Sequence, residues 1–102
     1  MEHLILHFGH GIRDIIPYSE FIRTIRPLLA QGQLGEYLGD DMAIDGGDAE
    51  AIFAGKDARA LYVFLTPYLR KLRFLQGAQV RLIFGPLDGD SEVEEFVLMD
   101  PA

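Results

Sequence analysis

Cysteine and tryptophan are both absent from this sequence. Without a thiol, the chain can form no disulfide, no thiolate zinc site and no cysteine-ligated iron–sulfur cluster. Serine and threonine are scarce, and no serine lies in a Gly-x-Ser-x-Gly turn, the motif that presents a nucleophilic serine. Carboxylate pairs are too frequent along the chain to identify acid–base catalysis. The sequence therefore identifies no catalytic residue and no cofactor, and we expect the protein not to be an enzyme.

Positive charge and long apolar runs are scarce as well. Lysine and arginine total 9 residues against 16 aspartate and glutamate residues, which gives a formal net charge of −7. A negative field repels nucleic-acid phosphates and attracts a basic protein partner. No stretch approaches the roughly 20 apolar residues of a membrane-spanning helix, so neither nucleic acid nor membrane is an expected partner. With 49% hydrophobic residues, residues 1–102 are predicted to form a single cytoplasmic domain.

The spacing of apolar residues predicts five strands and two helices, in the order β-α-β-β-α-β-β. The strands are expected at residues 2–9, 35–44, 49–54, 79–84 and 92–99. Asp14 and Asp57 are the expected N-caps of the two helices. The helices are expected to end at Gly32 and Gly77. Between the second and third strands, Asp45-Gly46 is typical of the tight turn of a hairpin.

These elements fit the α+β class, and in it a ferredoxin-like split βαβ sandwich. We expect an antiparallel sheet with two helices on one face, the strand order 2-3-1-4, and the fifth strand beside the fourth. The expected core consists of Leu4, Leu6, Phe8, Phe21, Ile25, Leu28, Leu61, Leu65, Leu69, Val80, Leu82 and Phe84.

Acidic residues cluster in two stretches, at residues 36–50 and 88–100, that contain no lysine or arginine. We interpret these stretches as docking surfaces for a basic protein. The residues expected to contact it are Asp40, Asp41, Asp45, Asp48, Glu50, Glu92, Glu94 and Glu95. The alternative interpretation is that charges on the two outer strands prevent aggregation at the sheet edges. The first stretch lacks the ligand spacing of an EF-hand, so no metal is expected.

The loop after the first strand suggests an alternative function. It reads Gly9-His10-Gly11 and is followed by Arg13, just ahead of the first helix. Backbone N–H groups in such a loop can hold an anion, and an imidazole can donate a proton. His10, Gly11 and Arg13 are therefore the alternative small-ligand or regulatory site.

A third interpretation is a homodimer without chemistry, formed through the sheet face that the helices leave uncovered. The alternation of the first strand places either Leu4 and its neighbours, or Ile5 with His3 and His7, on that face. Extended chain separates the two histidines by about 13 Å, too far to share a metal. We expect them to be half-exposed residues of the sheet.

Two segments carry a resemblance to known proteins: Met42 to Glu50 reads MAIDGGDAE, and Gly77 to Pro86 reads GAQVRLIFGP. In these segments the chain resembles a group of small uncharacterised bacterial proteins of about this length, and the likeness extends over residues 35–86. By type it also resembles immunity proteins of bacterial toxin systems, which are short, acidic, poor in cysteine and free of catalytic motifs. The first resemblance implies no activity. The second implies a protein that masks a basic toxin with an acidic surface.

Overall fold

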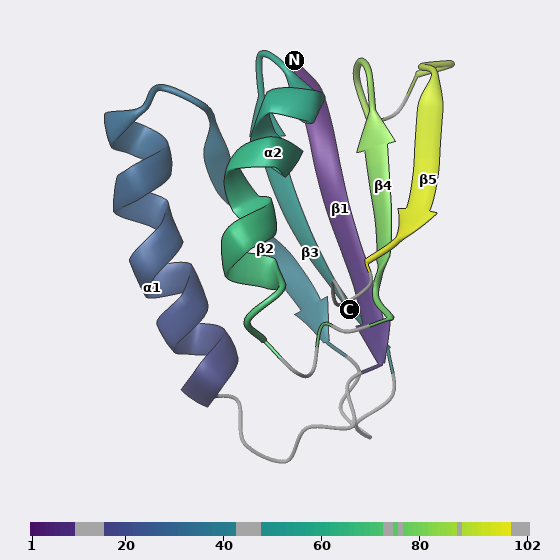
Figure 1. Ribbon diagram of the computed structural model, residues 1–102. Helices are drawn as coiled ribbons and strands as arrows, with labels where there is room; N and C mark the ends of the chain where they lie inside the picture. Colours follow the sequence, from purple (N-terminus) through teal and green to yellow (C-terminus); the bar gives the residue numbers. More distant parts are fainter. Residues whose placement is uncertain (10–15, 43–47, 73–74, 76, 88, 99–102) are drawn as a thin grey trace.

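The computed structural model describes residues 1–9, 16–42, 48–72, 75, 77–87 and 89–98, and in this part the chain is an α+β protein with two helices and an antiparallel sheet (Figure 1). Its strands are β1 (Glu2–Gly9), β2 (Glu36–Met42), β3 (Asp48–Gly55), β4 (Gln79–Ile83) and β5 (Val93–Val97). The helices are α1 (Ile16–Gln31) and α2 (Ala58–Leu69). The α+β class, the antiparallel sheet and the two helices expected from the sequence are confirmed. Asp14 and the Asp45-Gly46 turn lie outside the described residues.

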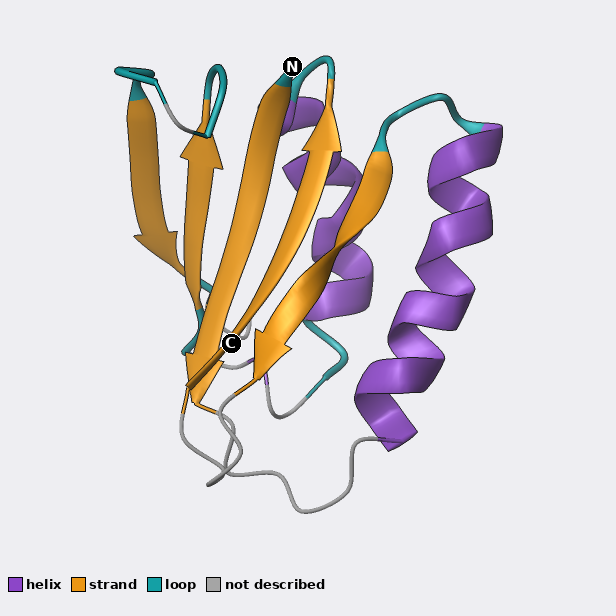
Figure 2. Ribbon diagram, turned by 180° about the vertical axis from the view of Figure 1, so that it is seen from behind, coloured by secondary structure: helices purple, strands orange, loops and turns teal. Residues whose placement is uncertain are grey.

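The five strands form one sheet in the order β2-β3-β1-β4-β5, and all neighbouring strands are antiparallel. This is the order in which the sequence analysis placed them. Both helices cover the same face: α2 lies over the middle of the sheet, and α1 lies beside it, next to the edge strand β2 (Figure 1). The other face carries no described helix (Figure 2).

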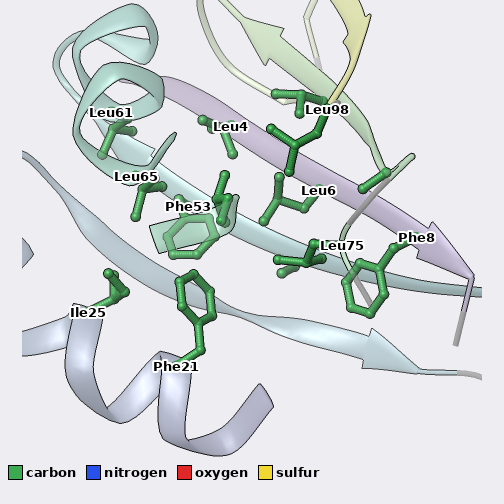
Figure 3. Close-up of a cluster of buried hydrophobic side chains, with 14 of the residues drawn as sticks. Leu4, Leu6, Phe8, Phe21, Ile25, Phe53, Leu61, Leu65, Leu75 and Leu98 are labelled. Atoms are coloured by element: carbon green, nitrogen blue, oxygen red, sulfur yellow. The ribbon is translucent and has the colours of Figure 1, made fainter. Parts of the chain in front are cut away.

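Alternation along β1 decides which residues enter the core. Leu4, Leu6 and Phe8 point toward the helices and are buried, while Ile5 lies on the uncovered face. The labelled side chains of Figure 3 show this cluster, in which Phe53 of β3 packs between β1 and the two helices. The core of the protein therefore lies between one sheet face and the helix layer.

Two residues of the expected core are only half-buried, namely Leu28 and Phe84. In α1 the fully buried residues are Ile25 and Leu29, one turn apart. Leu28 lies at the margin of this stripe, because α1 covers only an edge of the sheet and buries a narrow face. Phe84 follows the end of β4, and the Arg59 guanidinium lies 5.3 Å from its ring centre. The prediction was wrong for these two positions.

The helix α2 begins as predicted and ends earlier than predicted. Asp57 is its N-cap, since its carboxylate accepts a hydrogen bond from Ala60 N–H at 3.1 Å. A second backbone donor at this end, Ala58 N–H, is satisfied by Glu2 Oε1 at 2.8 Å, which ties α2 to the start of β1.

The expected end of α2 at Gly77 is wrong, because α2 ends at Leu69. Beyond Arg70, backbone hydrogen bonds change to three-residue spacing, from Lys71 N–H to Tyr68 O and from Leu72 N–H to Leu69 O. This tighter spacing does not propagate an α-helix. Pro67 contributes to this ending, because it supplies no N–H to the last turn.

Candidate functional site

The sheet face without a helix, here called the open face, is the first candidate site (Figure 2). Strand register aligns its residues in three rows across the sheet. In the order β2 to β5, the rows are Asp41-Glu50-His7-Gln79-Val97, Gly39-Ile52-Ile5-Arg81-Glu95 and Glu36-Ala54-His3-Ile83-Val93. The open face therefore carries Ile5 and the two histidines, and the core carries Leu4.

Charge on the open face is paired on one side and unpaired on the other. Arg81 Nε donates to Glu95 Oε1 at 2.8 Å across β4 and β5. Asp41 and Glu50 lie opposite each other on β2 and β3. Among the described residues, no lysine or arginine is within ion-pair distance of either carboxylate. The β2–β3 side of the open face thus presents uncompensated negative charge.

Apolar side chains occupy much of the rest of the open face. Ile5 and Ile52 are half-buried in its middle row, and Val93 and Val97 of β5 are 50% and 52% exposed. The open face therefore combines apolar side chains with charged ones.

The two histidines of the open face differ in exposure. His3 is buried, and its Nδ1–H donates to Gly85 O at 2.9 Å, which anchors the turn after β4. The expectation that His3 is half-exposed was wrong, because the turn covers it; His7 is half-buried. Within the described part of the chain, no three histidine, aspartate or glutamate side chains converge as a metal site.

The acidic residues predicted to contact a partner do not form one surface. Asp41 and Glu50 share the open face, but Asp40 lies on the helix side of β2. On β5, Glu95 lies on the open face, whereas Glu94 lies on the helix side and forms an ion pair with Arg59. Glu92 is exposed ahead of β5 and Asp48 is the first residue of β3, whereas Asp45 lies outside the described residues. The alternative ligand residues His10, Gly11 and Arg13 also lie outside the described residues.

A second candidate site lies between α1 and β2, on the helix side of the sheet. It is a groove of about 320 Å³, here called the α1–β2 groove, and it is lined by Tyr18, Ser19, Ile22, Arg23, Arg26, Tyr37 and Asp40. The Tyr18 and Tyr37 hydroxyl oxygens are 2.8 Å apart. The Tyr37 hydroxyl donates to Asp40 Oδ2, and the single proton of the Tyr18 hydroxyl is shared between the Tyr37 oxygen and Asp40 Oδ2, which is 3.2 Å away. These bonds attach the first turns of α1 to the edge strand.

The two tyrosines of the α1–β2 groove are held in the protonated form. Burial raises the pKa of Tyr18 far above its ordinary value, and the hydrogen bond to Tyr37 and the negative charge of Asp40 add to this effect. Burial and the hydrogen bond to Asp40 also raise the pKa of Tyr37 to about 12, against smaller opposing effects of the hydrogen bond from Tyr18 and the charge of Arg26. Both hydroxyls are therefore fixed donors around a carboxylate.

Sequence reasoning missed this cluster because strand alternation argues against it. Tyr37 and Asp40 are three residues apart, so a regular strand would place them on opposite faces. The pairing of β2 with β3 shifts register between Tyr37 and Gly39, and this irregularity brings Tyr37 and Asp40 to the same face. A glycine inside a strand, here Gly39, is the sequence signal that could have indicated a bulge. In the structure Gly39 has a φ of +143°.

None of the described helices has the length and apolar character needed to cross a membrane. No protein-family model matches the chain, and no curated protein or solved structure matches it either.

Proposed function

We propose that the protein is a protein-binding module whose open face docks a basic protein, most concretely an immunity-type antitoxin that masks a basic toxin. The observation that carries the proposal is the pair Asp41 and Glu50, two opposed carboxylates with no lysine or arginine within ion-pair distance in the described part of the chain. A basic partner would supply the missing cations, and a net charge of −7 would speed its approach. The likeness in type to immunity proteins of bacterial toxin systems points to the same class.

A second copy of the chain fits the open face less well than a basic protein. Among the strand positions of this face, Arg81 is the one lysine or arginine that the structure describes, and it already contacts Glu95. In a homodimer the described residues of this face would therefore supply no free cation to Asp41 and Glu50, and two acidic molecules would be brought together. We retain the homodimer as an outcome of the test below.

We also propose that the fold belongs to the ferredoxin-like split βαβ class, extended by β5. Support for this assignment comes from the order β2-β3-β1-β4, from the helix between β1 and β2, and from the helix between β3 and β4. Such a fold leaves one sheet face free of helices, and the proposed docking surface lies there.

The test compares three proteins as baits in native lysate: the wild type, the double variant Asp41→Lys/Glu50→Lys, and the control Glu20→Lys. Glu20 is exposed on α1, on the opposite side of the molecule, so its variant tests the effect of charge alone. We expect the wild type and the control to retain one basic protein that the double variant loses. The association rate of that purified protein should fall at least about tenfold in the double variant and should fall with added salt.

Growth assays connect this binding to the proposed masking. If the captured protein is toxic when expressed alone, co-expression of the wild type should relieve the toxicity and the double variant should not. Recovery of the same partner by the double variant, or a partner that is another copy of this chain, would contradict the proposal.

A further inference from the structure

The α1–β2 groove presents fixed charges of both signs that do not neutralise each other. Asp40 Oδ2 accepts from both tyrosine hydroxyls, while no described residue donates to its Oδ1. Arg23 and Arg26 line the same groove from α1. Among the described residues, neither guanidinium has a carboxylate within ion-pair distance. The groove therefore holds one anchored carboxylate and two uncompensated cations.

The position of the arginines on α1 is fixed by helix geometry. Arg23 and Arg26 are three residues apart, which places them as neighbours on one helix surface. Arg26 is close enough to Tyr37 for its charge to act on the tyrosine hydroxyl. Arginine matches the two oxygens of a carboxylate with paired N–H donors, so this pair is suited to a small anionic group.

We propose that the α1–β2 groove binds a small zwitterion of the α-amino acid class, with its ammonium group at Asp40 and its carboxylate at Arg23 and Arg26. The hydroxyls of Tyr18 and Tyr37 hold the Asp40 carboxylate in place, and the free Oδ1 accepts the ammonium group. Ile22 and the tyrosine rings provide apolar wall for the carbon skeleton. A volume of about 320 Å³ is at the small end of ligand pockets, which run from roughly 300 to 1,000 Å³.

Ligands with charge of only one sign fit this groove less well. An inorganic phosphate would contact the arginines but would also face the Asp40 carboxylate. A simple amine would contact Asp40 and leave the two guanidinium groups uncompensated. The groove lies on the helix side of the sheet, so this proposal is independent of partner docking on the open face.

The experiment titrates the full chain with individual free α-amino acids and follows backbone amide shifts of α1 and β2 by NMR. The same titrations use the N-acetyl derivative, which lacks the ammonium charge, the methyl ester, which lacks the carboxylate, and inorganic phosphate. We expect at least one free amino acid to give saturable shifts at groove residues. Each derivative should bind at least about tenfold more weakly, because each loses one charged contact.

Variants identify the residues responsible. Asp40→Asn keeps an oxygen acceptor for the tyrosines and removes the charge, and Arg26→Gln removes one guanidinium. Both should weaken binding at least about tenfold, whereas the matched controls Asp90→Asn and Lys56→Gln, at exposed positions outside the groove, should leave it within about twofold. The thermal midpoint reports on folding, and if Asp40→Asn unfolds, the exposed Arg26 decides the question.

Three results would overturn the proposal. The first is the absence of saturable shifts in the groove with every free amino acid. The second is equal binding of the N-acetyl derivative, and the third is phosphate binding as tight as that of the amino acids, since either result would make the arginines a simple anion site.

Discussion

Asp41 of β2 lies directly opposite Glu50 of β3, so two like charges face each other across neighbouring strands. Directly opposed like charges destabilise a sheet. In the same sheet Glu95 forms an ion pair with Arg81, whereas no lysine or arginine in the described part of the chain pairs with Asp41 or Glu50. The Asp41–Glu50 pair lowers the stability of the isolated protein, and it is available to a cation of another protein. The proposed docking function requires both properties.

Removing one of these two charges should stabilise the free protein. We expect Asp41→Asn to raise the free energy of unfolding by about 0.2–1 kcal/mol at low salt, with a smaller gain at high salt because ions screen the repulsion. Urea unfolding at two salt concentrations measures this. The control Glu95→Gln should give no gain, since it removes the contact with Arg81; an equal gain in both variants would contradict the pairing described here.

Truncation of Leu65 tests the packing of the core beneath α2. Its side chain is fully buried, and truncation in Leu65→Ala should cost about 2–5 kcal/mol of unfolding free energy. Val63, on the same helix, is 71% exposed, and Val63→Ala should change stability by no more than about 0.5 kcal/mol. Chemical denaturation of both variants checks the helix orientation, and similar losses would show that α2 does not face the sheet in this way.

The Tyr37 hydroxyl should make the folded protein sensitive to alkaline pH. Its pKa is raised from 10.0 to about 12 on folding, so between these values the folded state keeps a proton that the unfolded state releases. The stabilisation is complete below pH 10 and is lost as the pH rises toward 12. Tyr37→Phe should show a smaller decline of the unfolding free energy over this range, measured by denaturation at successive pH values. An unchanged decline would mean that folding does not raise the pKa of the Tyr37 hydroxyl through burial and the contact with Asp40.

Alanine substitutions at Gly35 and Gly39 distinguish the cost of a steric clash from the cost of an unfavourable backbone conformation. Both have positive φ values, +156° and +143°, which disfavour alanine. A Cβ at Gly35 would lie 2.1 Å from the Ala54 carbonyl oxygen, whereas a Cβ at Gly39 would meet no atom within 4 Å. Gly35→Ala should therefore cost about 1–3 kcal/mol more than Gly39→Ala. Thermal unfolding of both variants checks this, and equal losses would contradict the close approach of β2 to β3.

The sequence shows which segments are charged, but not which charged side chains lie together in the fold. The acidic stretch at residues 36–50 is continuous in the sequence, but neighbours within it separate in the fold, with Asp40 on the helix side and Asp41 on the open face. Partners such as Arg59 for Glu94 come from another element, 35 residues away. Pairing of this kind depends on strand register and helix placement, which composition does not contain.

The sequence by itself determined the features that depend on local periodicity and local hydrogen bonds. Alternation from Leu4 to Phe8 gave β1 a buried face, and Asp57 capped α2 through an amide only three residues away. Only the tertiary structure determined which residues form the α1–β2 groove. The Tyr18–Asp40 contact joins residues 22 apart in the sequence, and it needs a register shift in β2. The physical reason is that one irregular pairing reverses the face on which a strand side chain lies, and only the neighbouring strand imposes it.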